Sequence, residues 1–456
     1  MDEKYNVYKI NEIFLEPDAH YDRSIPSNFK HDSYFYCVLS SCYKLLRNIF
    51  STIIIAPLKY KLSGVSSYKS LYEGKILFRL PSLNNIRSVN RVIEEVCCKR
   101  PNVHVLEGVL DNKYYPLVLM DLVSIWYLPQ LWHGFKKLSP IEKKIVCYNL
   151  VNFCFTPGVV WFYRKMLKKH RPECVVLAND HIFLTKPLAL LCEDYGVPCV
   201  YIQHASVSYA FPELHFSCSF LDGMDSLKKY AYEGKSCKGK ILLLGAARFD
   251  ELSKVRTKRD YRKRECIGLS INKIDDNAMC DDLCNDLLRR YPQKTIKIRM
   301  HPAMKNHPFM FSEKTRIIST CATDESIFDY LDSIDLQISN DSSVHLDAIL
   351  GGVKTVAYNL SNYSYGDNYG YVKKGMVQLA KTKEQLFHFI DNVNNITIKE
   401  EIVRQYDESF KKKYEGKCSE IIAEYIISGC QFDMIENKYD MEKKGYNHHT
   451  YYVIPN

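Results

Sequence analysis

The chain has 456 residues, of which 46% are hydrophobic and 25% charged, a balance that is typical of a soluble globular protein and excludes a disordered chain. Its formal net charge of +9 suits a phosphorylated ligand, an anionic lipid surface or nucleic acid. Nucleic acid is the least favoured of these partners, because no arginine-rich arm, zinc-finger spacing or aromatic nucleic-acid-binding signature accompanies the charge.

The seventeen cysteines are odd in number, scattered and without a Cys-x-x-Cys pair. Together with a polar amino terminus that lacks a secretory signal, they predict a reduced, cytoplasmic protein without structural zinc. The most apolar early run, residues 49–57, is about half the length that spans a bilayer, so a buried helix or strand is the favoured interpretation. Basic residues flank this run, and shallow attachment to the inner face of a membrane is the alternative.

Residues 1–70 lack a clear pattern, and we expect an amino-terminal extension there. The segment 71–240 then alternates short apolar runs with helical periodicity, which indicates a first Rossmann-like domain. We expect this domain to bind the acceptor, the substrate that receives a transferred group. We expect its strands at 75–79, 103–106, 174–178 and 198–203, and its helices at 84–97, 117–135, 140–169 and 185–195.

The segment 241–430 repeats this arrangement, and a polar tail at 431–456 ends the chain. We expect strands at 240–245, 266–270, 295–300, 316–319, 336–339 and 354–359, and helices at 277–290, 325–331, 344–350 and 399–428. Continuous apolar strands that alternate with helices predict parallel sheets covered on both faces. The fold class is therefore α/β, with two doubly wound, Rossmann-like domains that face a cleft.

Ligands of open parallel sheets bind beyond the carboxyl ends of the strands, and four polar clusters lie there. The first is Arg299-Met300-His301-Pro302, where Arg299 and His301 share one face by strand alternation. An arginine and an imidazole suit a phosphate, or a leaving group that gains charge. The alternative is a capping histidine beside a solvated arginine.

The second cluster, residues 340–343, precedes the helix at 344–350. The hydroxyls of Ser342 and Ser343, with the amides of a helix amino terminus, form an anion site. Helix capping is the alternative, and it is compatible with phosphate binding. We expect His301 and the serine pair to follow neighbouring strands and to converge on one phosphate.

The other two clusters, Gln203-His204 and residues 179–181, follow strands of the first half. Asp180 or His204 can accept the proton of an acceptor hydroxyl there. A loop residue hydrogen-bonded to the backbone is an equally good interpretation for each.

Several chemistries lack their motif. No glycine-rich dinucleotide fingerprint, no phosphate-cradling loop and no Gly-x-Ser-x-Gly elbow occurs. Asp-x-Asp, which would hold a metal and a sugar diphosphate, is also absent. We therefore expect no obligatory metal and no cofactor besides a nucleotide-activated substrate.

At these clusters the sequence resembles a bacterial superfamily of the GT-B fold. It includes capsule and O-antigen glycosyltransferases for sialic acid or Kdo, and the CDP-glycerol glycerophosphotransferases of teichoic acid synthesis. The resemblance rests on YIQHA at 201–205, LGAARFDEL at 244–252, RMHP at 299–302, SNDSSVHLDAILGG at 339–352 and YEGKCSEIIAEYI at 414–426. Ala205 stands where the family usually has glycine.

The resemblance implies that His301, Ser342 and Ser343 contact the phosphate of the donor nucleotide, with Arg248 as a further contact and Arg299 beside them. It implies a histidine base at His204 in the CDP-glycerol branch, and an aspartate base, here Asp180, in the sialyltransferase branch. The expected function is transfer of a CMP-linked nonulosonic acid or Kdo onto a lipid-linked capsule or O-antigen glycan. The alternatives are transfer from CDP-glycerol or CDP-ribitol, and a non-catalytic component of capsule assembly or export.

Overall fold

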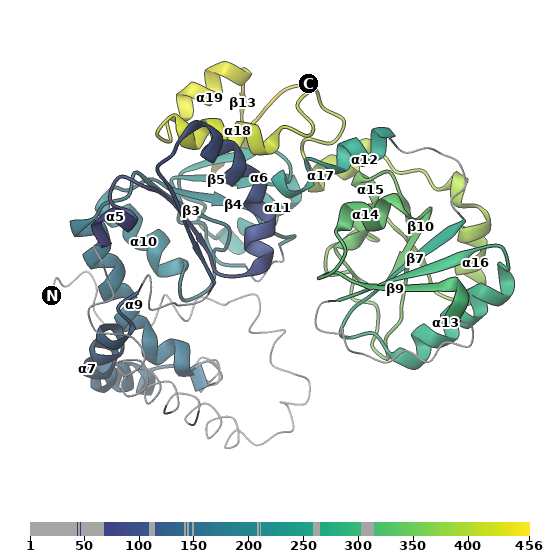
Figure 1. Ribbon diagram of the computed structural model, residues 1–456, viewed down its shortest axis with the longest axis horizontal. Helices are drawn as coiled ribbons and strands as arrows, with labels where there is room; N and C mark the ends of the chain where they lie inside the picture. Colours follow the sequence, from purple (N-terminus) through teal and green to yellow (C-terminus); the bar gives the residue numbers. More distant parts are fainter. Residues whose placement is uncertain are drawn as a thin grey trace. The chain divides into compact units, whose positions relative to one another are not determined.

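The structure is a computed structural model that describes residues 68–108, 115–140, 143, 146–147, 150–207, 209, 211–258, 265–301 and 314–456, together with Tyr43 and Leu46. The chain divides into two compact units (Figure 1). Unit 1 holds the chain up to Leu221 with Ser226–Leu243 and Ser419–Pro455, and unit 2 holds Asp222–Asp225 and Leu244–Cys418. The apolar run at 49–57 and nearly all of the predicted extension lie outside the described residues.

Unit 1 is built on an eight-stranded sheet in the order β13-β14-β6-β5-β4-β3-β1-β2. Its strands are β1 (Ile76–Leu80), β2 (Val103–Glu107), β3 (Cys174–Leu177), β4 (Cys199–Ile202), β5 (Cys218–Leu221), β6 (Lys240–Leu243), β13 (Glu442–Tyr446) and β14 (His449–Val453). All neighbours are parallel except β13 and β14, which form an antiparallel hairpin. The chain order reverses at β1, between β2 and β3, which is the switch point of this sheet.

The helices of unit 1 connect these strands and cover the sheet. They are α5 (Tyr68–Tyr72), α6 (Leu83–Lys99), α7 (Leu117–Lys136), α9 (Leu150–Lys169), α10 (Lys186–Tyr195), α11 (Met224–Tyr230), which begins in unit 2, α18 (Cys418–Ile427) and α19 (Phe432–Tyr439). Helices α7 and α9 pack closely, because a Cβ at Gly158 would overlap the Met120 carbonyl. The Gly158 amide donates to the Ser124 hydroxyl at 3.0 Å, which fixes this contact.

The carboxy-terminal segment differs from its prediction. The expected helix at 399–428 is two helices, α17 (Glu400–Tyr406) and α18, and the expected polar tail is α19 followed by β13 and β14. Strand β14 pairs in parallel with β6 and so belongs to the sheet of unit 1. The prediction of a polar tail is therefore wrong. The sequence of β13 shows no apolar strand pattern because its side chains are largely exposed. Of the two strands of the hairpin, only β14 carries buried side chains (Tyr451, Tyr452 and Val453).

Unit 2 is built on a six-stranded, all-parallel sheet in the order β12-β11-β10-β7-β8-β9. Its strands are β7 (Cys266–Ile271), β8 (Thr295–Met300), β9 (Ile317–Cys321), β10 (Leu336–Ser339), β11 (Lys354–Tyr358) and β12 (Gln378–Ala380). Its helices are α12 (Leu252–Lys258), α13 (Asn277–Arg290), α14 (Ile327–Asp332), α15 (Val344–Leu350), α16 (Lys383–Asp391) and α17.

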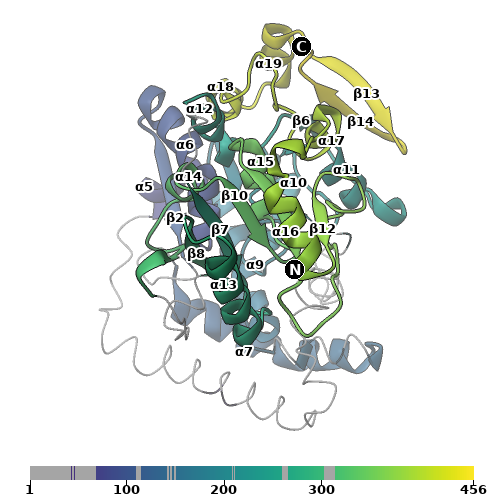
Figure 2. The same cartoon turned by 90° about the vertical axis from the view of Figure 1, so that its right-hand side faces the viewer.

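Two apolar cores lie on opposite faces of this sheet, and Figure 2 shows the helices that cover it. Helices α13 and α16 pack on one face, while α12, α14, α15 and α17 pack on the other. Both units are therefore doubly wound, Rossmann-like α/β domains, and the predicted fold class is confirmed. Within the described residues, no helix combines the length and the apolarity that crossing a bilayer requires.

Candidate functional site

The switch point of the unit 2 sheet lies between β7 and β10, and the loops that follow these two strands are bound to each other. The Asn340 amide group donates to the Asp275 carboxylate at 2.9 Å. The same carboxylate accepts from the Asn272 backbone amide at 2.6 Å. Ligands of open parallel sheets bind at such a point, and here the two loops form one rigid edge.

A buried histidine, His345, holds the loop after β10 in place through hydrogen bonds. One imidazole nitrogen of His345 lies 2.9 Å from the Asn340 carbonyl oxygen, and the other lies 2.6 Å from the Thr355 hydroxyl. Burial lowers the pKa of His345 to about 4, so the ring is neutral at pH 7. Asp341 accepts a hydrogen bond from the Asn368 amide at 2.7 Å, which fixes the loop from a second side.

Ser342 and Ser343 are half-buried in this fixed loop. Within the described part of the chain, Ser343 caps α15 without a side-chain hydrogen bond, and the Ser342 hydroxyl accepts only a long one, 3.4 Å from the Val344 amide. The loop is thus held by Asn340 and Asp341, while the two hydroxyls contribute little to its conformation. Such a loop can present both hydroxyls to an anion.

His301 directly follows β8, and its backbone amide donates to the Ile271 carbonyl at 3.0 Å. Its half-buried ring has a lowered pKa, first because of burial and then because of the charge of Lys273. We had expected His301 and the serine pair to follow neighbouring strands. They do not, because strand β7 lies between β8 and β10. Two strand spacings separate them by about 10 Å at the backbone.

The loop after β7 fills the interval between them and carries Lys273, an exposed residue to which the sequence analysis assigned no role. Its charge contributes to the lowered pKa of His301, and the two residues follow adjacent strands, β7 and β8. A pair of this kind favours an anion that would lie against both. The signal that could have identified Lys273 is its place directly after the predicted strand at 266–270, which is the first strand of the unit 2 sheet.

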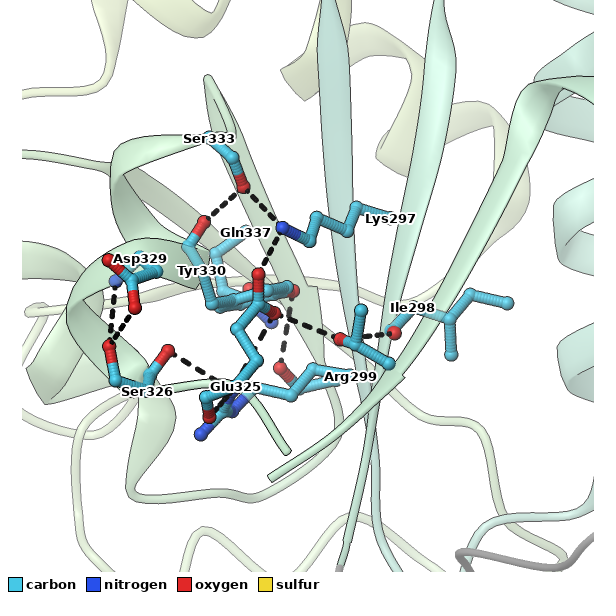
Figure 3. A network of polar contacts seen from close by, with 11 residues as sticks. Lys297, Ile298, Arg299, Glu325, Ser326, Asp329, Tyr330, Ser333 and Gln337 are labelled. Atoms are coloured by element: carbon cyan, nitrogen blue, oxygen red, sulfur yellow. Dashed lines mark hydrogen bonds and ion pairs between the residues drawn. The ribbon is translucent and has the colours of Figure 1, made fainter. Parts of the chain in front are cut away.

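Arg299 is bound within the domain (Figure 3). Its guanidinium donates to the carbonyls of Glu325 at 3.0 Å and Ser326 at 3.4 Å, and it lies 5.3 Å from the Tyr330 ring centroid. Lys297, on the same face of β8, pairs with the Glu325 carboxylate. This network ties β8 to the start of α14. The arrangement gives no support to the predicted contact between Arg299 and a phosphate.

Arg248 also has a partner inside unit 2. It lies in a short 3-10 helix, Ala247–Phe249, and forms a two-pronged ion pair with Asp222, at 3.1 and 2.6 Å. Burial raises the pKa of Asp222, and the guanidinium opposes that rise. The pair holds Asp222–Asp225 to the body of unit 2, and a phosphate would have to compete with the Asp222 carboxylate for Arg248.

In unit 1, Asp180 lies just beyond β3 and is 3% exposed. One carboxylate oxygen lies 2.7 Å from Nδ1 of His181, and the other accepts from the Tyr230 hydroxyl at 2.7 Å. The Tyr230 hydroxyl lies 2.9 Å from that of Tyr201. Burial raises the pKa of Asp180, but His181, Tyr230 and the charge of His204 together lower it below its ordinary value.

His204 follows β4, the next strand of the sheet, and is half-buried. Its ring centroid lies 6.4 Å from that of His181. The predicted pair Asp180 and His204 therefore belongs to one cluster, in which Asp180 is the buried charge and the imidazoles surround it. The polar run at 179–181 includes His181, but its orientation by the carboxylate was not predicted, and neither was the role of Tyr230, which lies fifty residues away in the chain.

Among the residues with described positions, no three His, Cys, Asp or Glu side chains gather in a way that could hold a metal ion. The polar groups of the two candidate clusters are instead mainly hydroxyl, imidazole and amide groups, which form hydrogen bonds with oxyanions and with acceptor hydroxyls.

No protein-family model and no curated protein matches the chain. Among solved structures, a protein from Listeria monocytogenes assigned as a UDP-N-acetylglucosamine 2-epimerase has a TM-score of 0.50 at 14% identity, over 78% of this chain and 96% of its own. The UDP-GlcNAc 2-epimerase from Neisseria meningitidis has a TM-score of 0.48 at 15% identity, over 78% and 100%. The wall teichoic acid polymerase TagF has a TM-score of 0.46 at 13% identity, over 89% and 98%. The first likeness shows that the chain shares the GT-B fold, and it does not extend to the reaction.

Proposed function

We propose that this protein is a glycosyltransferase that moves a sugar from a nucleotide donor onto a bacterial surface glycan, without an obligatory metal. The observation that carries the proposal is the unit 2 switch point, where a fixed loop displays Ser342 and Ser343 and where Lys273 and His301 follow the adjacent strands β7 and β8. Phosphate groups bind at this place in doubly wound sheets.

On the donor side, His301, Ser342, Ser343 and Lys273 would hold the phosphate and stabilise the charge that it gains as it leaves. Hydrogen-bond donors on a rigid loop are effective in this role, because they need no reorganisation when the charge develops. A phosphate between His301 and Lys273 would also raise the pKa of His301 and favour its protonated form.

On the acceptor side, an imidazole of the Asp180 cluster would be the base, and Asp180 would position it. The carboxylate already accepts from Tyr230 and contacts His181, and its lowered pKa makes it a poor proton acceptor. His204 is the more exposed of the two imidazoles, and it is the base that we favour. The acceptor O–H bond breaks, its proton passes to the imidazole, and the oxygen attacks the anomeric carbon. The bond from that carbon to the phosphate oxygen breaks, and the nucleotide leaves with the electron pair.

We favour a CMP-linked nonulosonic acid or Kdo as the donor and a lipid-linked capsule or O-antigen glycan as the acceptor. A nucleoside monophosphate leaves without needing a divalent cation, in keeping with the missing Asp-x-Asp motif. One observation favours the second candidate, transfer from CDP-glycerol or CDP-ribitol. His301 and the serine pair stand two strand spacings apart, about 10 Å, which a diphosphate spans better than a monophosphate.

Donor screening tests the proposal. The purified chain is titrated calorimetrically with CMP, CDP and UDP, and turnover is measured with CMP-sialic acid, CMP-Kdo, CDP-glycerol and CDP-ribitol. Binding of CMP with turnover of a CMP-sugar supports the favoured reaction, while turnover of a CDP-polyol supports the second. Failure of all three nucleotides to bind at millimolar concentration would overturn both, and a non-catalytic role in capsule assembly or export would replace them.

A further inference from the structure

Helix α7 of unit 1 has one face that packs and one that does not. Its buried side chains, Met120, Asp121, Ser124, Tyr127, Leu131 and Gly134, recur at helical spacing, and the close contact at Gly158 shows that they face α9. The other side of the helix carries Leu119, Leu122, Ile125, Trp126 and Trp132, all exposed. Figure 1 and Figure 2 show α7 at the margin of unit 1, beside α9.

The amount of exposed apolar surface on α7 is unusual for this molecule. Fourteen large apolar side chains are exposed within the described residues, and five of them lie on this one helix. Trp126 is 78% exposed and Trp132 is 59% exposed, and these are two of the three tryptophans in the chain. Clustered exposed apolar side chains mark an interaction surface.

The charge on this surface identifies the kind of partner. The only acidic residue of α7 is Asp121, which is buried. The helix ends in exposed Lys136, whose ammonium lies 5.6 Å from the Trp132 ring, and exposed Lys137 follows it. Tryptophan and lysine beside an aliphatic stripe are typical of helices that lie in the headgroup region of a bilayer. The net charge of +9 further favours an anionic surface.

We propose that the exposed face of α7 docks on the headgroup region of an anionic phospholipid bilayer, with Leu119, Leu122 and Trp126 inserted among the acyl chains and Lys136 and Lys137 against the phosphates. This places membrane contact on an element other than residues 49–57. The proposal does not depend on the proposed reaction, because it follows from the surface of α7 alone.

Co-sedimentation of the full chain with vesicles tests it. We expect binding to vesicles of phosphatidylcholine mixed with phosphatidylglycerol, weak binding to phosphatidylcholine alone, and a blue shift of tryptophan emission on binding. The variant Leu122→Glu should weaken binding about tenfold or more, since it removes an inserted group and adds a repelled charge. Leu83→Glu is the matched control, because Leu83 is an even more exposed leucine of unit 1 on α6, and it should bind as the unchanged chain does.

A second variant, Trp126→Glu, should reduce binding in the same way and remove part of the emission shift. Equal binding by Leu122→Glu and Leu83→Glu would overturn the proposal, as would failure of the unchanged chain to bind anionic vesicles. A dimer in solution that Leu122→Glu converts to a monomer, without vesicle binding, would show that a second copy covers this face instead. No donor or acceptor enters these measurements, so their failure is distinct from failure of the proposed function.

Discussion

The polar groups beyond β3 in unit 1 and those beyond β7 and β10 in unit 2 occupy equivalent places in their sheets, yet they are built in opposite ways. Around Asp180, side chains bind side chains, and a buried carboxylate is held by His181 and Tyr230. Around Ser342, side chains bind both backbone groups and one another to hold the loop, and the serine hydroxyls take little part in these contacts. The first arrangement fixes a charge and the second fixes a loop. Proton transfer requires the former, and anion binding requires the latter.

The largest expected effect is on the anion side. His301→Ala should lower kcat by two or more orders of magnitude, because it removes a contact that strengthens as charge develops on the phosphate. The measurement is steady-state turnover with the donor found by screening. His388→Ala, at an exposed histidine of α16, is the control and should leave turnover unchanged. A loss of only a few-fold for His301→Ala would reduce that residue to a structural cap.

The next largest effect is expected at the Asp180 cluster of unit 1, where the proton of the acceptor would be taken up. Asp180→Asn should lower kcat about 10- to 100-fold and move the acidic limb of its pH profile to lower pH, because the imidazolium loses a stabilising carboxylate. Tyr230→Phe removes one hydrogen bond to Asp180 but keeps the charge, so its pH profile should stay in place. An unchanged profile in Asp180→Asn would show that the carboxylate does not support the base.

Substitution of Arg299 tests whether the network in Figure 3 stabilises the fold or contributes to nucleotide binding. Arg299→Gln should lower the free energy of unfolding by about 1–3 kcal/mol, since the carbonyls of Glu325 and Ser326 lose a charged donor. The affinity for the nucleotide should not change. Chemical denaturation and calorimetry measure the two quantities, with the exposed Arg289→Gln of α13 as control. Loss of nucleotide binding without loss of stability would return Arg299 to the donor site.

The smallest effect concerns Asp407, whose pKa burial raises to about 7. Between the ordinary value and about 7, the folded chain binds more protons at this group than the unfolded chain, so stability falls as pH rises through this window. The slope from one group is at most about 1.4 kcal/mol per pH unit. Asp407→Asn should flatten the pH dependence of unfolding measured by circular dichroism, and Asp332→Asn, at an exposed site of unit 2, should not. A slope that survives in Asp407→Asn would assign it to other groups.

The sequence predicted best those elements whose signal is local and continuous. Strand β8 at 295–300 and helix α13 at 277–290 have the predicted bounds, because alternating apolar residues define the strand and a capped amphipathic period defines the helix without help from the rest of the chain. Strand β5 was missed, although β3, β4 and β10 have the same four-residue length. The hairpin of β13 and β14 was missed because its burial depends on β6, about two hundred residues earlier.

The candidate site divides in the same way. The positions of Asp180, His204, His301 and the serine pair beyond strand ends follow from strand periodicity alone. Which of them are neighbours does not, because chain order and sheet order differ: β7 precedes β8 in sequence but separates it from β10 in space. The partners of Arg248 and Arg299 are likewise fixed by tertiary contacts that no local pattern encodes.

The pairing of β14 with β6 has a consequence for how the protein is made. Unit 2 is almost a continuous stretch, Leu244–Cys418, whereas unit 1 receives α18 and its last two strands from the final forty residues or so of the chain. Domains commonly fold in the order in which the ribosome releases them, amino-terminal part first. Here the amino-terminal unit is completed last, and until then β6 has an open edge that can pair with other chains. Unit 1 therefore completes its sheet only after the carboxy terminus has been synthesised, while unit 2, which is encoded later than most of unit 1, can fold before it.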